Sequence, residues 1–291
     1  MSGEASGVQL EVLHTAQVPT PYHYVFRAPG SRAAQLRAGF DKKGRLLQSP
    51  CLAYVVRHRD IGALLIDTGL HPDASTNLRK DFGVLMSRMF SALKPADTPY
   101  VEQLRSVGVE PDEVEVVLMT HLHLDHTSGM RLLPNARFIC AQQEWQAASG
   151  RFAAANGYRR SHLPLESRVQ LLDFPTQGEP YDVFAQTIDL AGDGSIRLVL
   201  TPGHTPGHQS VLLRLDDGRE VLLVGDAAYT GGNIRQQLLP MLTSNDEASL
   251  SSLRELNAFA QGHPQAILVP SHDPDAWRQL AQDPSPQPTP A

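Results

Sequence analysis

Short apolar runs rich in β-branched residues recur along the chain, and polar or turn-forming residues bound them. The runs CLAYVVR (51–57) and ALLIDTG (63–69) flank a short polar stretch, which is typical of two paired strands. The runs at 210–215 and 219–226 flank Asp217-Gly218, a sequence that favours a hairpin turn. Further strands are predicted at residues 114–120, 136–141, 196–201 and 266–270.

Residues 78–93 predict a helix, because apolar side chains recur there at helical spacing. Two interpretations of this apolar stripe stay open. It packs into the core, or it forms the adaptable wall of an apolar ligand pocket, since methionine suits variable ligands. The residues concerned are Phe82, Leu85, Met86, Met89 and Phe90.

Two more helices carry start signals. Asp97 or Thr98 is the expected cap of a helix that ends before Gly108, and Ser244 to Glu247 has capping-box spacing. Helices thus alternate with strands and hairpins, which predicts a layered α/β fold with mixed sheets. Residues 14–50 mix aromatics with prolines, and we expect an ordered arm over the site or a dimer contact.

Both ends of the chain are polar and rich in small residues or proline. We therefore expect a disordered N-terminus at residues 1–7, a single domain over residues 8–281 and a disordered tail at residues 282–291.

Composition narrows the function classes. The 291 residues include 25 Lys+Arg and 31 Asp+Glu, a net charge of −6 that argues against a broad nucleic-acid surface. Cys51 and Cys140 make no disulfide framework, so a reducing, cytoplasmic setting is expected. No signal peptide and no transmembrane segment is predicted, so no membrane partner is expected.

The segment HLHLDH places four potential metal ligands in six residues, directly after a predicted strand. These are His121, His123, Asp125 and His126. Packed together, such groups would lose solvation and repel one another unless a cation compensated. Imidazole and carboxylate without thiolate suit Zn²⁺, and also iron, manganese or cobalt.

Three more candidate ligands follow other predicted strands: His204, Asp226 and His272. One zinc ion takes about four ligands, so seven are too many for one ion and suit two. A carboxylate can bridge two ions, which predicts a site with ions about 3.5–4 Å apart.

These motifs also carry a resemblance. HLHLDH, TPGHTPGHQS, GDAAY, SHD and the preceding LLIDTG resemble the metallo-β-lactamase superfamily, an αββα sandwich of two mixed sheets flanked by helices. Among its members the chain is most similar to the quorum-quenching N-acyl-homoserine lactonases. The resemblance covers roughly residues 50–275 and implies a ligand set. His121, His123 and His204 hold one zinc, Asp125, His126 and His272 hold the other, and Asp226 bridges them with a hydroxide.

The same resemblance assigns roles to other residues. Tyr229 would meet the substrate carbonyl or ring oxygen, although an ordinary half-buried tyrosine is the alternative. Asp125 would take a proton from the nucleophile and return it to the leaving alkoxide. Asp67 would orient a ligand histidine, and His208, which is not a ligand in relatives, would be structural or would support a ligand residue.

The expected function is the opening of a lactone ring, with an N-acyl-homoserine lactone bearing an apolar acyl chain as substrate. The alternatives are hydrolysis of another lactone, of a thioester as in glyoxalase II, or of a phosphoester. Glyoxalase II carries a helical region after its last metal histidine, and only 19 residues follow His272. A non-catalytic metal-binding module has little use for so complete a ligand set. Oligomeric state stays open, with a homodimer as one alternative.

Overall fold

The computed structural model describes residues 7–282. The predicted disorder at residues 1–6 and 283–291 lies outside this range. Gln282, which the sequence assigned to the tail, instead belongs to the last helix. No helix within residues 7–282 is long and apolar enough to cross a membrane.

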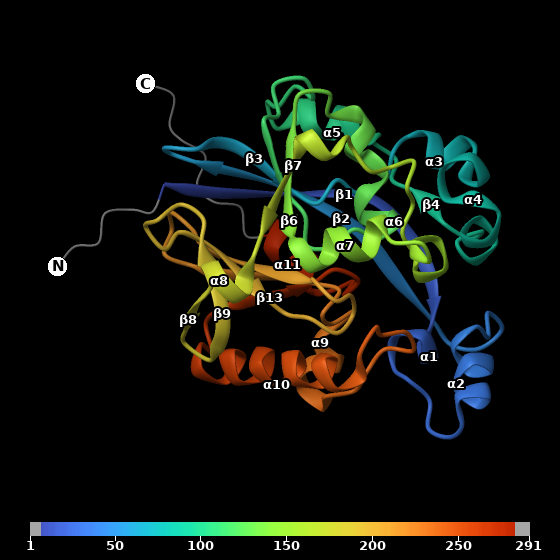
Figure 1. Cartoon of the computed structure of the whole chain (residues 1–291). Helices are drawn as coiled ribbons and strands as arrows, with labels where there is room; N and C mark the ends of the chain where they lie inside the picture. The colour runs from blue at the N-terminus through green and yellow to red at the C-terminus, as the bar shows by residue number, and fades with distance from the viewer. Residues whose placement is uncertain (1–6, 283–291) are drawn as a thin grey trace.

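Two mixed sheets lie face to face (Figure 1). The first has the order β4 (Lys94–Pro95), β1 (Val8–Pro21), β2 (Leu46–His58), β3 (Gly62–Ile66), β5 (Val116–Leu118), β6 (Arg137–Ala141), β7 (Val169–Leu172). The second has the order β13 (Ile267–Pro270), β12 (Glu220–Gly225), β11 (Gln209–Arg214), β10 (Ile196–Leu200), β9 (Phe184–Asp189), β8 (Glu179–Tyr181).

Helices cover the outer faces of the sandwich (Figure 1). The longer ones are α2 (Arg32–Gly39), α4 (Leu78–Met89), α5 (Tyr100–Ser106), α7 (Gln142–Ser149), α10 (Asp246–Gly262) and α11 (Ala276–Gln282). Shorter ones are α1 (Tyr22–Val25), α3 (Asp73–Thr76), α6 (Leu124–Thr127), α8 (Phe174–Gln177) and α9 (Gly231–Gln236). The arrangement confirms the predicted αββα sandwich.

Alternation along the strands explains the layers, because successive side chains point to opposite faces. In β2, Val56 joins the core between the sheets, where it packs with residues such as Leu198 of β10. Its neighbour Val55 instead packs under α5 with Leu104. The outer face of the second sheet is covered in the same way by Leu253 and Leu256 of α10, among others.

The predicted strand pairs and hairpin are confirmed, but both predicted helix caps are wrong. β2 pairs with β3 and β11 with β12, all antiparallel. Asn245 caps α10 by accepting the N–H of Ala248, because the Ser244 hydroxyl donates to the carbonyl oxygen of Gly203 instead. α5 begins after Pro99, with no side-chain cap.

The N-terminal arm, residues 14–50, is ordered and forms the end of β1, α1, α2 and the start of β2. Arg27 fixes it to the first residue of α10 and to the segment before that helix. Its Nε donates to the carbonyl oxygen of Pro240 at 2.9 Å, and its guanidinium pairs with the Asp246 carboxylate at 2.8 Å. The hydrogen bond and charge of Arg27 lower the pKa of Asp246 to about 2.

The Arg27–Asp246 pair makes a pH-dependent contribution to stability. A carboxyl whose folded pKa is lowered stabilises the fold above its unfolded pKa of about 3.9, and this contribution is lost as the pH falls toward 2. We expect Asp246→Asn to lower the free energy of unfolding at pH 7 by no more than about 1 kcal/mol, since Asp246 is half exposed. Urea unfolding at several pH values measures the difference, which should vanish in acid. An equal difference at every pH would contradict the ion-pair account, and Asp275→Asn, at an exposed position, is the control.

Candidate metal centre and its cavity

Four strand ends meet at one edge of the sandwich. His121 follows β5, His204 follows β10, Asp226 follows β12 and His272 follows β13. β5 lies in the first sheet and the other three in the second, so the site is built between the two sheets. The structure brings all seven predicted ligands together. Among residues 7–282, no other histidine, cysteine, aspartate or glutamate joins these groups.

The Asp226 carboxylate lies at the centre of this cluster. Its oxygens are 3.3 Å from Nε2 of His272 and 3.4 Å from Nε2 of both His126 and His204. Nε2 of His121 lies 3.8 Å away. Asp226 thus contacts histidines from three separate loops, as a carboxylate shared between two ions would need to.

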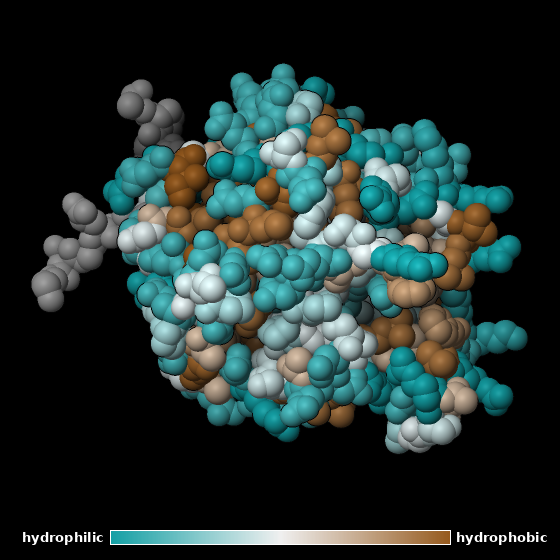
Figure 2. Space-filling view, viewed as in Figure 1, coloured by the Kyte–Doolittle hydropathy of each residue, from teal (hydrophilic) through white to brown (hydrophobic). Residues whose placement is uncertain are grey.

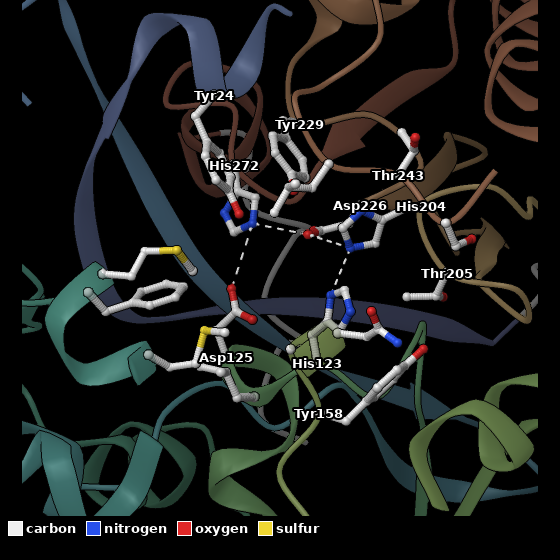
Figure 3. Close-up of a pocket in the computed structure, with 18 of the residues that line it drawn as sticks. Tyr24, His123, Asp125, Tyr158, His204, Thr205, Asp226, Tyr229, Thr243 and His272 are labelled. Atoms are coloured by element: carbon white, nitrogen blue, oxygen red, sulfur yellow. Dashed lines mark hydrogen bonds and ion pairs between the residues drawn. The ribbon is translucent and has the colours of Figure 1, made fainter. Parts of the chain in front are cut away.

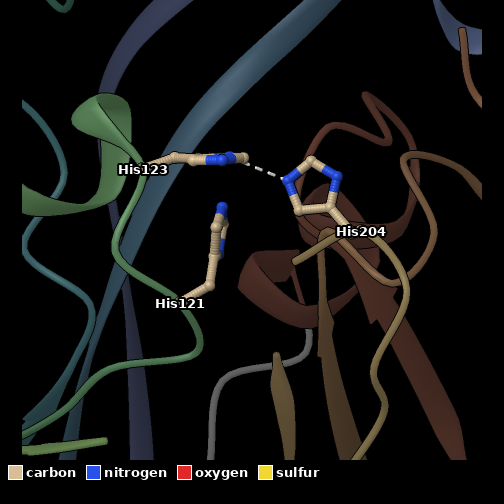
Figure 4. Close-up of side chains that lie close together, drawn as sticks. All are labelled: His121, His123 and His204. Carbon is tan, nitrogen blue, oxygen red and sulfur yellow. Dashed lines mark hydrogen bonds between the residues drawn. The ribbon is translucent and has the colours of Figure 1, made fainter. Parts of the chain in front are cut away.

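The potential ligand atoms fall into three overlapping groups in which all atoms lie within 4.8 Å of one another. These are His121, His123 and His204; His121, His126 and Asp226; and Asp125, His126 and His272. The rings of the first group point toward one another, with 2.9 Å between Nδ1 of His123 and Nε2 of His204 (Figure 4).

The chemistry of the cluster fits divalent cations. Burial lowers the pKa of His121, His123 and His204, so their imidazoles are neutral near pH 7 and offer lone pairs. Nε2 of His121 and Oδ1 of Asp226 are buried and have no hydrogen-bond partner among the described residues. Buried polar atoms without partners are rare, and a bound cation would satisfy both.

Asp67 holds the cluster from behind. Its carboxylate accepts the backbone N–H of Thr120 at 2.8 Å and the Thr120 hydroxyl at 2.7 Å. The same carboxylate lies 2.7 Å from Nδ1 of His126, which leaves Nε2 of that ring facing Asp226. Asp67 has a φ of 56°, a strained value for a non-glycine residue that the surrounding bonds stabilise.

His208 plays the same kind of role for Asp226. Its Nε2 accepts the backbone N–H of Asp226 at 2.9 Å, so Nδ1 carries the ring proton and faces Thr201 Oγ1 at 2.9 Å. Burial lowers the pKa of His208 to about 3, which keeps the ring neutral and able to accept. His208 is therefore structural, as expected.

Glu144 is a site residue that sequence reasoning missed. It is fully buried, and its two carboxylate oxygens accept the backbone N–H of Leu122 at 2.8 Å and of Gly207 at 3.2 Å. Leu122 lies in HLHLDH and Gly207 in TPGHTPGH, so one carboxylate joins the two ligand loops. A lone glutamate at the start of a helix carries no signal of such a role in sequence.

A cavity of about 450 Å³ opens beside the cluster (Figure 3). One wall is apolar and includes Val18, Leu124, Met86, Met89 and Phe90, and the other is polar and includes Asn156, Tyr158, Thr205 and Thr243. Both interpretations of the 78–93 stripe therefore hold in part, because Phe82 is buried while Met86, Met89 and Phe90 line the cavity. Both are wrong for Leu85, which is 67% exposed and does not line the cavity.

Tyr229 reaches the cavity between the two halves of the cluster. Its ring lies edge-on to His204, with ring centres 5.7 Å apart, and to His272, with ring centres 5.2 Å apart. Tyr24 of the arm stacks on it at 6.0 Å and also lines the cavity (Figure 3). The arm therefore contributes to the site, as the first of the two expectations for residues 14–50 stated. The alternative, a dimer contact, is not tested by this contact.

We expect Glu144→Gln to loosen both ligand loops, since the amide NH₂ cannot accept one of the two N–H groups. The loss should lower the free energy of unfolding by about 1–3 kcal/mol. Urea unfolding of the metal-free protein measures it, with the exposed Glu102→Gln as control. A Glu144→Gln protein as stable as the control variant would show that this carboxylate does not join the loops.

The chain is similar to a known protein family and to proteins of known activity. Residues 47–272 match the model of the metallo-beta-lactamase superfamily. N-acyl homoserine lactonase AttM from Rhizobium radiobacter is 34% identical over 225 residues, which cover 77% of this chain and 82% of that protein. The N-acyl homoserine lactonase AiiA of Bacillus thuringiensis subsp. kurstaki is 28% identical, with 79% of this chain and 84% of that protein covered.

Solved structures show the same fold. An N-acyl homoserine lactone hydrolase with the product N-hexanoyl-L-homoserine bound at its catalytic metal center has a TM-score of 0.72 at 24% identity, covering 96% of this chain and 98% of its own. AidC, a dizinc quorum-quenching lactonase, has a TM-score of 0.62 at 13% identity, covering 94% of this chain and 90% of its own. On the family match and the AttM relatives, this chain belongs to the metallo-beta-lactamase superfamily.

Proposed function

We propose that this protein is a two-metal hydrolase that opens the lactone ring of N-acyl homoserine lactones. The observation that carries the proposal is the clustering of seven ligand groups, four of them histidines within 3.8 Å of the Asp226 carboxylate, at the floor of a cavity with one apolar wall. The curated relatives with this fold are named N-acyl homoserine lactonases, which favours a lactone over a thioester or phosphoester.

The three groups of ligand atoms support the division over two ions that the family resemblance implies. His121, His123 and His204 would hold one ion, and a second set, Asp125, His126 and His272, would hold the other, with Asp226 shared. Imidazole and carboxylate ligands suit Zn²⁺ best, with iron, manganese and cobalt as alternatives. Two such ions lower the pKa of a water molecule and polarise a carbonyl group.

The cavity suggests how the substrate lies. An acyl chain gains most from the wall formed by Met86, Met89 and Phe90, because transfer of each methylene out of water contributes about 0.8 kcal/mol. α4 supplies this wall because it changes direction at Gly83, whose φ of 79° and ψ of 173° are not helical. The lactone ring then lies over the cluster, next to Tyr229.

Two side chains are placed to handle protons and charge. The Tyr229 hydroxyl is a donor for the oxygen that becomes negative when the ring carbonyl is attacked. Asp125 faces the cavity with Oδ2 3.8 Å from Nε2 of His272. Its carboxylate can accept a proton from the attacking water and return it to the alkoxide of the opened ring.

The direct test of the function is a substrate screen on metal-loaded protein. N-hexanoyl homoserine lactone, a lactone without an acyl amide, a glutathione thioester and a phosphodiester are compared by product formation. We expect the N-acyl homoserine lactone to have the highest kcat/KM, and expect its turnover to stop with a chelator and return with Zn²⁺. Preference for the thioester or the phosphodiester would contradict the proposal.

Tyr229→Phe removes one hydroxyl and no proposed metal ligand. Loss of a single oxyanion donor costs about 10²–10³ in kcat, and a metal that shares the task makes the loss smaller, so we expect a fall of roughly tenfold or more. Metal content, measured by elemental analysis, should stay unchanged. Tyr22→Phe, outside the cavity, is the control. Unaltered kinetics in Tyr229→Phe would show that this hydroxyl does not contact the reacting oxygen.

A further inference from the structure

Positive charge is concentrated in two segments, although the chain as a whole is acidic. Residues 31–46 and 78–94 together hold nine basic and two acidic residues, a formal charge of +7. The rest of the chain therefore carries a formal charge of −13, which brings the total to −6. One of the two acidic residues, Asp81, is buried against Arg131 and His162, so its charge does not reach the surface.

These segments form one face of the molecule, which we call the basic face. The two lie at the same edge of the sandwich, where α2 and α4 are found in Figure 1. Lys42, in the loop after α2, joins them, because its Nζ donates to the carbonyl oxygens of Arg88 and Met89 at 3.1 and 3.0 Å. The cavity opens between the segments, since Arg32 of α2 and Met86 of α4 both line it.

The cations of the basic face are exposed, and almost none of them forms an ion pair. Among the described residues, Lys80 with Asp73 is the one ion pair that a basic residue of the two segments forms, at 3.7 Å. Arg37, Lys43, Arg79 and Arg88 are all exposed. Their charges therefore act on whatever lies in front of this face.

Apolar side chains lie among these cations. Four large hydrophobic residues of the two segments are exposed: Phe40 (45%), Leu46 (37%), Val84 (48%) and Leu85 (67%). Figure 2 shows apolar surface between protruding hydrophilic side chains along this edge. Exposed apolar groups set among lysines and arginines are typical of proteins that lie on an anionic bilayer.

We propose that the basic face docks this protein on an anionic lipid bilayer, with Val84, Leu85, Phe40 and Leu46 entering the headgroup region. A second copy of the chain is a poor occupant, because a symmetric dimer would set the same cations against one another. An acidic protein would satisfy the charges but has less need of four exposed apolar side chains. The sequence leads us to expect no membrane partner, because the net charge is negative and no spanning segment is predicted. Neither of these reports how charge is distributed over the surface.

Docking would turn the cavity mouth toward the lipid. Long acyl chains partition into bilayers, so a docked enzyme would meet such substrates at the surface; this consequence alone rests on the proposed function. The docking itself is tested without any substrate. Its failure would leave the hydrolase assignment intact, and failure of the hydrolase assignment would leave docking intact.

The experiment measures co-sedimentation of the full chain with phosphatidylcholine vesicles, with and without phosphatidylglycerol. We expect binding only to vesicles that contain phosphatidylglycerol, with weaker binding as salt rises. The variant Arg37→Gln/Lys43→Gln/Arg79→Gln/Arg88→Gln removes four cations that do not line the cavity. Each basic residue near such a surface contributes about fivefold, so loss of four should lower binding by roughly several hundred-fold.

A matched variant removes four exposed arginines from other faces: Arg105, Arg137, Arg254 and Arg278. Both variants change the net charge equally, and only the first should lose vesicle binding, while both keep hydrolysis of a short-chain soluble lactone. Leu85→Ser should weaken binding most at high salt. Equal loss in both variants, or no binding of the wild type at low salt, would overturn the proposal. Tighter binding to poly-glutamate than to vesicles, unchanged by Leu85→Ser, would overturn it in favour of an acidic protein partner. A dimer that dissociates in the first variant and not in the matched one would overturn it in favour of a second copy of the chain.

Discussion

The crowding of four histidines around the buried carboxylate of Asp226 is the constraint on which this site depends. Asp226 is 3% exposed, and Nε2 atoms of four imidazoles lie within 3.8 Å of it. Burial keeps His121 and His204 neutral by lowering the pKa of both rings, and their lone pairs face the same small volume as the carboxylate, which is unfavourable without positive charge between them. A pair of divalent cations resolves this conflict, and the geometry is that of a site prepared to receive them.

The surrounding fold keeps those side chains in place before any ion binds. Asp67 fixes His126, His208 holds the backbone of Asp226, and Glu144 joins the two loops that carry His123 and His204. All of these hydrogen bonds are buried. Those to Asp67 and Glu144 involve a carboxylate, and the one to His208 runs from a backbone N–H to a neutral ring, so each is costly to break. The rigidity of the sandwich is thereby passed to the ligand atoms, as pre-organised metal sites require.

The sequence predicted the layered fold and the seven candidate ligands because their signals are local. HLHLDH lies within six residues, and His204, Asp226 and His272 each follow an apolar strand. Glu144 and Tyr24 could not be predicted, because each acts through contacts with residues distant in sequence and carries no motif of its own. The caps of α5 and α10 were mispredicted for a related reason. Ser244 is used by a tertiary contact with Gly203, which spacing along the chain does not report.

The central claim is that one buried carboxylate organises two metal ions, and titration of metal-free protein with Zn²⁺ tests it most directly. Calorimetry should give about two ions per wild-type chain, with lactone turnover rising only as the second is bound. Asp226→Ala should bind fewer ions and lose turnover, whereas the exposed Asp275→Ala should match the wild type. A single ion per chain at full turnover, or an Asp226→Ala protein that still binds two, would contradict the account.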